Sequence, residues 1–204
     1  MSSLKRLLLV RHGHARSNAD DCVSSVPPGD GLSDLGVEEA LALRETLAHE
    51  PLDLGVATRL ARTQETLELA LGARDVPRIV LPGLDEICFG SFEGGPLADY
   101  RTWAWTNEPD VVCPGGGESR AHAAERFANA LDTLLARPEE VVLAVSHALP
   151  IRYLLDAADG AFPAARIDHV PHGVPFPLDA EAVERAAETL RVWATAPRFA
   201  NERA

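Results

Sequence analysis

Two short and almost uninterrupted apolar runs constrain the fold of this chain more than any other feature of its sequence. Residues 7–10 read Leu-Leu-Leu-Val, and residues 141–145 read Val-Val-Leu-Ala-Val. A strand with one face in solvent alternates apolar and polar residues, whereas runs of this kind are typical of strands buried on both faces. Such strands occur in parallel sheets with helices on both sides, so the two runs favour an α/β fold.

Helix-like and strand-like segments alternate along the rest of the chain. Helical apolar spacing occurs at residues 33–48, 58–71, 119–137, 148–155 and 179–193, and further strands are expected at 54–57, 78–81 and 167–178. Ser33 and Thr58 are the expected N-caps of the first two helices, and an irregular polar loop at about 15–31 precedes them. This order predicts a three-layer α/β/α sandwich with a mainly parallel central sheet.

Length and composition narrow the class of protein. At 204 residues the chain is most simply one domain, and we expect residues 1–204 to form it, with a small cap or insert at about 88–118. The formal net charge of −12 argues against nucleic acid or a membrane surface as a partner, and an anionic substrate would need a local cluster of cations. Three cysteines without metal-ligand spacing fit a cytoplasmic protein better than a disulfide framework.

Both apolar runs end in a histidine. Arg11, His12 and Gly13 follow the first run, and Ser146 and His147 follow the second. In open α/β sheets, ligands bind where strands end at their carboxyl edge. Neutral histidine is a nucleophile at cellular pH, and arginine offers phosphate a charged fork of donors. One histidine at a strand end is more often structural, but a pair of this kind favours a functional site.

In its motifs the chain resembles the histidine phosphatase superfamily, also called the phosphoglycerate-mutase-like family, and within it the phosphatase branch. Arg11-His12-Gly13 followed by Asn18 matches the signature of the nucleophile. Further blocks that match in order and spacing lie at residues 58–66, 84–94, 117–126 and 145–152. The resemblance covers about residues 7–178, and it implies the same α/β/α sandwich that the apolar pattern predicts.

The resemblance also implies roles for single residues. The implied catalytic residues are His12, which would become a phosphohistidine, Glu86, which would act as general acid and then base, and His147. The implied phosphate-binding residues are Arg11, Asn18 and Arg62, and those of a substrate pocket are His14, Ser17 and His172. The acid role requires Glu86 to have a raised pKa, which Asp85 or a pocket of low dielectric could provide. No metal ion and no cofactor are implied.

These features together predict a metal-independent phosphomonoesterase, similar to histidine acid phosphatases, that acts on a phosphorylated small molecule. The nearest alternative is a cofactor-dependent mutase of the phosphoglycerate type, although the chain between Gly94 and Glu118 is short for one. A metal-dependent hydrolase using His12 and His14 and a non-catalytic phosphate-binding module are more distant alternatives. The natural substrate and the oligomeric state stay open, a homodimer being one option.

Some positions depart from the family pattern without removing a catalytic group. His14 and Ala15 stand next to the expected nucleophile, where the family more often has a glutamate or glutamine and a threonine or serine. These departures bear on the shape of the substrate pocket. The aromatic residues Tyr100, Trp103 and Trp105 are expected to serve packing more than substrate binding, although a lid over the site could use them.

Overall fold

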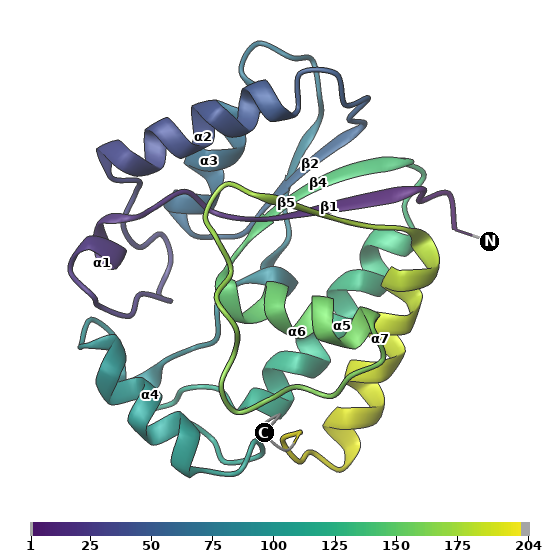
Figure 1. Cartoon of the computed structure of the whole chain (residues 1–204). Coiled ribbons are helices and arrows are strands. Elements are labelled where there is room, and N and C mark those ends of the chain that lie inside the picture. The colour runs from purple at the N-terminus through teal and green to yellow at the C-terminus, as the bar shows by residue number, and fades with distance from the viewer. Residues whose placement is uncertain (1, 201–204) are drawn as a thin grey trace.

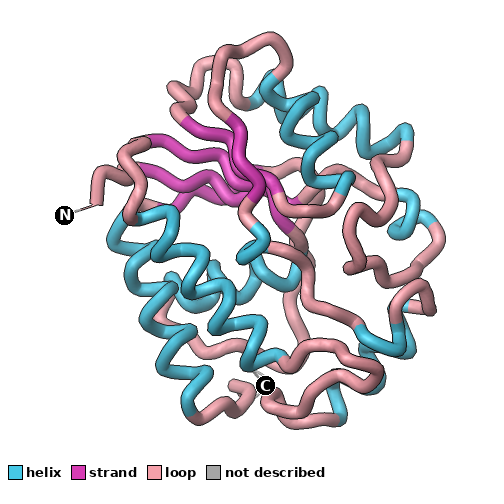
Figure 2. Tube along the Cα trace, turned by 180° about the vertical axis from the view of Figure 1, so that it is seen from behind, coloured by secondary structure: helices cyan, strands magenta, loops and turns pink. Residues whose placement is uncertain are grey.

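The computed structural model describes residues 2–200 and contains a five-stranded sheet with the strand order β3-β2-β4-β1-β5. The strands are β1 (Arg6–Arg11), β2 (Leu54–Ala57), β3 (Arg78–Val80), β4 (Val141–Ser146) and β5 (Pro175–Leu178). β1, β2, β3 and β4 run parallel, and only β5 pairs antiparallel, along β1. Figure 2 shows the sheet between its helices. The prediction of a mainly parallel sheet is confirmed.

Helices cover both faces of the sheet (Figure 1). α2 (Asp34–Thr46) and α3 (Ala61–Leu71) lie on one face, and α5 (Arg120–Leu135), α6 (Ala148–Ala158) and α7 (Ala180–Thr195) lie on the other. Alternate side chains of β1 serve the two cores: Leu7 and Leu9 belong to the cluster under α5, α6 and α7, and Leu8 and Val10 to the cluster under α2 and α3. The apolar run is continuous because β1 is buried on both faces.

Short elements and loops occupy the carboxyl edge of the sheet. They are α1 (Arg16–Ala19), the 3₁₀ turns η1 (Pro82–Leu84) and η2 (Gly90–Phe92), and α4 (Leu97–Thr106). The loop after β1 is tied to the segment around η2, because Val23 exchanges backbone hydrogen bonds with Gly94 and Gly95. The Glu93 carboxylate accepts from the backbone N–H and the hydroxyl of Ser25. Residues 15–31 and 88–118 are therefore joined at this edge.

Three local predictions need correction or refinement. Ser33 caps α2 as expected, but α3 begins at Ala61 with Leu60 as its N-cap, so Thr58 is not a cap. α1 lies inside the segment predicted to be an irregular loop. The strand predicted at 167–178 is confined to Pro175–Leu178, because the sheet partner β1 ends at Arg11 and offers residues 167–171 nothing further to pair with. No helix within residues 2–200 has both the length and the apolar character to cross a bilayer.

Candidate active site

His12 and His147 lie together because the strands that carry them are neighbours. β1 pairs with β4 with Arg11 opposite Ser146, and each strand is followed directly by its histidine. The backbone N–H of His12 also donates to the carbonyl oxygen of Ser146 at 3.0 Å. The two imidazole centroids are 5.2 Å apart, and both side chains are buried. The candidate site therefore lies at the carboxyl edge of the sheet.

The partners of the two ring nitrogens of His12 decide which of them carries the proton. Nδ1 lies 2.7 Å from the carbonyl oxygen of Gly13, which can only accept, so Nδ1 holds the proton. Nε2 accepts a hydrogen bond of 3.1 Å from Nε of Arg62 and is unprotonated. Burial, followed by the charges of Arg62 and Arg11, lowers the pKa of His12 well below 6.5. His12 is thus a neutral imidazole with the lone pair on Nε2.

Arg62 lies between the two histidines, in the first turn of α3. Its Nη2 donates to the carbonyl oxygen of Ser24 at 2.8 Å and lies 3.3 Å from Nδ1 of His147. Its Nη1 is buried without a hydrogen-bond partner, and the nearest carboxylate oxygen, on Asp30, is 3.6 Å away. A buried guanidinium with a spare donor beside an unprotonated imidazole nitrogen can bind an oxyanion.

Arg11 places a second cation at the same edge. Its Nη1 donates to the carbonyl oxygen of Val170 at 2.8 Å, and its buried Nε has no hydrogen-bond partner. Burial lowers the pKa of Arg11 to about 10, which still leaves the side chain charged at neutral pH. Asn18, in α1, accepts from the backbone N–H of Ala15 through its Oδ1, so that its amide hydrogens remain available.

Glu86 follows η1 and lines the same cavity as His12. Its carboxyl group accepts a hydrogen bond of 3.0 Å from the backbone N–H of Ile87. Burial raises the pKa of Glu86 above 4.5, against the opposite effects of that hydrogen bond and of Arg62 and Arg11. A carboxyl group with a raised pKa can hold a proton near neutral pH and give it to a base that forms in the cavity.

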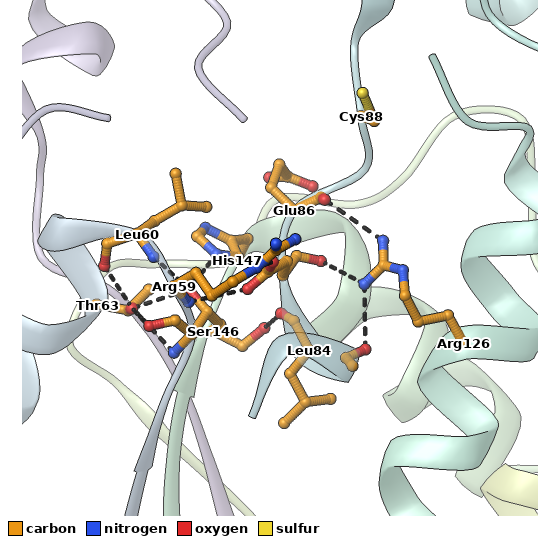
Figure 3. Close-up of polar contacts among 12 residues, drawn as sticks. Arg59, Leu60, Thr63, Leu84, Glu86, Cys88, Arg126, Ser146 and His147 are labelled. Atoms are coloured by element: carbon orange, nitrogen blue, oxygen red, sulfur yellow. Dashed lines mark hydrogen bonds and ion pairs between the residues drawn. The ribbon is translucent and has the colours of Figure 1, made fainter. Parts of the chain in front are cut away.

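Two arginines hold the loop that carries Glu86 (Figure 3). Arg126, from α5, donates to the backbone carbonyl of Asp85 at 3.0 Å and binds the Glu118 carboxylate through Nε and Nη2 at 3.0 and 2.7 Å. Arg59 binds the Asp85 carboxylate through its backbone N–H and its guanidinium. Because Asp85 is paired with Arg59, burial rather than Asp85 accounts for the raised pKa of Glu86.

His147 is not among the residues that line the cavity, but it contacts two that are, His12 through its ring and Arg62 through a hydrogen bond. Its Nδ1 accepts from Arg62, so Nε2 carries the proton and donates to the hydroxyl of Thr58 at 3.1 Å. The Thr58 hydroxyl in turn lies 2.9 Å from that of Thr63. Burial is the first cause that lowers the pKa of His147, and it keeps the ring neutral. Thr58, expected to cap a helix, instead orients this imidazole.

The cavity has a volume of about 440 Å³. His12, Glu86, Arg11 and Arg62 lie on its wall, together with Ser17 and Asn18. Further side chains that line it, most of them apolar, aromatic or cationic, include Phe89, Leu97, Tyr100, Arg101, Trp105, Arg120, Leu149 and Arg166. The local cluster of cations that an anionic substrate needs in so acidic a chain is therefore present.

His14 and His172 lie near the cavity but are not among its lining residues. His172 donates from Nδ1 to the carbonyl oxygen of His12 at 2.6 Å, and the two rings are 5.5 Å apart. His14 lies 5.6 Å from the ring of His172, and its Nδ1 is 2.8 Å from the hydroxyl of Ser33. Within residues 2–200, no three His, Cys, Asp or Glu side chains are grouped as ligands for a metal ion.

Comparison with known families agrees with this geometry. Residues 7–174 match the model of the histidine phosphatase superfamily (branch 1). The chain belongs to this superfamily. A curated member, the adenosylcobalamin/alpha-ribazole phosphatase of Salmonella typhimurium, is 32% identical over 173 residues, which cover 80% of this chain and 84% of that protein.

Two further histidine phosphatase relatives extend the comparison. A metal-independent phosphoserine phosphatase of Arabidopsis thaliana is 28% identical over 72% of this chain and 65% of its own length. The crystal structure of the alpha-ribazole phosphatase from Shigella flexneri superimposes with a TM-score of 0.71 at 28% identity, covering 85% of this chain and 90% of that one. These three relatives are named as phosphatases, and the α/β/α fold expected for the superfamily is confirmed.

Sequence reasoning missed several residues of this histidine phosphatase site. Thr66 lies in the matched block at residues 58–66 without an implied role, and the structure shows that its hydroxyl accepts from the backbone N–H of Gly13 at 2.9 Å. Tyr100 and Trp105, which were expected mainly to pack, line the cavity. Arg120 was not considered, although it follows directly on the Gly-Glu-Ser block at residues 117–119 and so lay beside a recognised signal.

Proposed function

We propose that this chain hydrolyses phosphomonoesters of small molecules, without a metal ion, through a phosphohistidine on His12. The proton on Nδ1 of His12 carries the proposal, because it leaves Nε2 unprotonated, and the Nε2 lone pair becomes the nucleophile once the donor Nε of Arg62 turns to the bound phosphate. Nε2 attacks the phosphorus atom, a P–N bond forms, and the bond from phosphorus to the leaving oxygen breaks. Arg11, Arg62 and Asn18 then stabilise the charge on the three peripheral oxygens.

Glu86 serves both halves of the proposed reaction. In the first half its protonated carboxyl group gives a proton to the leaving alkoxide, which departs as an alcohol. In the second half the Glu86 carboxylate takes a proton from water while the water oxygen attacks phosphorus and the P–N bond breaks. His12 and the protonated Glu86 are thereby restored, and inorganic phosphate is released. The raised pKa of Glu86 supports this role.

His147 supports the same site through Arg62 rather than by an independent step. Its neutral ring is fixed by Thr58 and accepts from Nη2 of Arg62, which helps to orient the guanidinium towards the nucleophile. Phe89, Leu97 and Trp105, all from residues 88–118, line the cavity. We propose that this segment acts as a cap that contacts the leaving group. A mutase would need the dephosphorylated product to stay bound there and be rephosphorylated.

The first experiment measures phosphate release from a panel of phosphomonoesters in excess chelator, with the His12→Ala protein as the blank. Release that persists in chelator and disappears in the blank is the expected result. Phosphoryl transfer to an acceptor in place of water would favour the mutase. Activity that the chelator removes and a divalent cation restores would overturn the metal-independent mechanism.

A further inference from the structure

The wall of the cavity contains a buried cation that the proposed chemistry does not use. Arg120 is the first residue of α5, and only 7% of its surface is exposed. Its Nη1 donates to the hydroxyl of Tyr153 at 2.9 Å and to the carbonyl oxygen of Ala165 at 3.3 Å. Its guanidinium carbon also lies 6.0 and 5.7 Å from the ring centroids of Tyr153 and Phe199. All of these partners are uncharged.

A counter-ion for Arg120 is missing from the part of the chain that the structure describes. The ion pairs among residues 2–200 place other arginines beside carboxylates but leave Arg120 without one. Removing an unpaired charge from water is strongly unfavourable. Unpaired buried charges of this kind are found where a ligand supplies the opposite charge.

An unused polar atom accompanies this charge. Nε of Arg120 is buried without a hydrogen-bond partner, and Arg120 lines the cavity that contains His12. The buried hydroxyl of Tyr100 also lies on that wall beside the Arg120 guanidinium, whose proximity counteracts the rise in the pKa of Tyr100 that burial causes. Arg101, also on that wall, lies close enough to Arg11 to lower its pKa. Native structures leave few buried polar atoms unsatisfied, and such atoms in a cavity wall indicate a missing partner.

A purely structural role would explain only part of this arrangement. The hydrogen bonds from Nη1 tie the start of α5 to α6 and to the loop before residue 170. They make use of one nitrogen of the guanidinium, and a neutral donor could form them without the cost of burying a charge. Such a role does not explain why this charged side chain lies in the wall of the cavity that also contains His12, Arg11 and Arg62.

We propose that Arg120 binds a second anionic group on the leaving-group side of the substrate, a carboxylate or a second phosphate. The preferred substrates are then phosphomonoesters whose alcohol portion is itself an anion, held between the phosphate site at His12 and the cation at Arg120. Arg101, at the more exposed part of the wall, adds to the positive potential there. This inference rests on the proposed phosphatase function and specifies its substrate class.

The test compares substrates that differ only in the second charge. We would measure kcat/KM for carboxylic acids that carry a phosphate ester at the far end of chains of increasing length, and for their methyl esters. Alkanediol bisphosphates and the matching monophosphates form the second arm, which separates a carboxylate from a phosphate as the preferred anion. For at least one chain length we expect the substrate with the second anionic group to be preferred by about tenfold or more, equivalent to about 1.4 kcal/mol.

Variants then connect this preference to Arg120. Arg120→Met should reduce the ratio of acid to ester to about one, and Arg120→Lys should retain part of it because it keeps the charge. Arg137→Met is the matched control, since Arg137 lies just beyond the other end of α5 and is bonded to Glu139. That variant should keep the wild-type ratio. Because both members of each pair share the phosphoryl site, the ratio removes general effects on the chemistry.

The outcomes separate this inference from the function on which it rests. If the wild-type protein releases phosphate in a His12-dependent manner but at no length prefers the member with the second anionic group, the second-anion site is overturned and the phosphatase function stands. If no compound yields phosphate, both proposals fail. A folded Arg120→Met protein that keeps the preference would assign the residue a structural role. If Arg120→Met does not fold, as judged by its thermal transition, the decision rests on the wild-type protein and on Arg120→Lys. A wild-type preference that Arg120→Lys leaves unchanged would then contradict the assignment, and a reduced preference would support it.

Discussion

At the scale of single residues, the site depends on two titratable groups whose pKa values are displaced in opposite directions by the same cause. Burial disfavours the charged form of each, so it lowers the pKa of His12 and raises that of Glu86. A neutral imidazole and a protonated carboxyl group can therefore exist together over a wider range of pH than they could as free histidine and glutamate side chains. This is the pair of protonation states that the first half of the proposed reaction requires.

The role of Glu86 predicts a dependence on the leaving group. Glu86→Gln should lower kcat/KM for alkyl phosphates by about 100-fold or more, because an alkoxide is a poor leaving group without a proton donor. The loss should be much smaller for p-nitrophenyl phosphate, whose leaving group departs as a stable anion. Steady-state rates on both substrates check this. Equal losses would show that Glu86 is not the acid.

The opposite pKa shifts predict the shape of the pH profile. Activity on alkyl phosphates should fall on the acid side as His12 is protonated, below its ordinary value of 6.5. It should fall on the alkaline side as Glu86 ionises, above its ordinary value of 4.5. In Glu86→Gln the alkaline decrease should be lost, and a comparison on the same substrate cancels the ionisation of the phosphate itself. An unchanged alkaline decrease in this variant contradicts the assignment.

At the scale of elements, His12, the proposed nucleophile, is held by contacts between segments far apart in the chain. The turn after β1 is fixed by α3, because Thr66 accepts from the N–H of Gly13 and donates to the carbonyl oxygen of Arg62. One threonine thus connects the turn that carries His12 to the helix turn that carries the phosphate-binding arginine. The position of His12 relative to Arg62 is consequently a property of the packing of β1 against α3.

Replacement of Thr66 tests this connection. Thr66→Val keeps the shape but leaves the buried N–H of Gly13 unsatisfied, so we expect the free energy of unfolding to fall by about 1–3 kcal/mol and kcat to fall with it. Thr133→Val is the control, since the exposed Thr133 forms the same kind of bond to a helix carbonyl, that of Asn129. Urea unfolding and phosphatase assays check both variants. Equal effects of the two substitutions on the free energy of unfolding and on kcat would show that Thr66 has no special role in the site.

The elements also show how far sequence reasoning reaches. The helices at α2, α5 and α7 were predictable, because each buries one apolar stripe with the spacing of a helix. The extent of β5 was not, because it depends on where its partner β1 ends, which is a property of pairing and not of residues 167–178 themselves. Likewise the tautomer of His12 depends on the Gly13 carbonyl, and the direction of a carbonyl cannot be read from a residue type.

At the scale of the whole molecule, the positive charges are concentrated in one place although the chain as a whole is acidic. The chain has a formal net charge of −12, yet five arginines line one cavity: Arg11, Arg62, Arg101, Arg120 and Arg166. The need for such a local cluster could be predicted from net charge alone, whereas its members beyond Arg11 and Arg62 could not. Arg101, Arg120 and Arg166 come from α4, the start of α5 and the loop before β5, which meet only after folding.

The hydrophobic core between the sheet and helices α5, α6 and α7 should determine the stability of the protein without taking part in the chemistry. Trp193, on α7, is almost fully buried, and its ring centroid lies 5.9 Å from that of Tyr153. Trp193→Ala should lower the free energy of unfolding by about 3–5 kcal/mol. The neighbouring Val192 is 49% exposed, so Val192→Ala should change it by less than about 0.5 kcal/mol. Denaturant curves check both, and kcat of the folded Trp193→Ala protein should match wild type.

The position of β1 between β4 and β5 has a consequence for how the protein is made. β1 is near the beginning of the chain, but both of its neighbours in the sheet come from the last third of it. The bond from His172 to the carbonyl of His12 alone spans 160 residues. Contacts so distant in sequence form late and slowly. During synthesis on the ribosome, His12 therefore emerges long before the strands that flank β1, and its surroundings are completed only after β5 has left the ribosome.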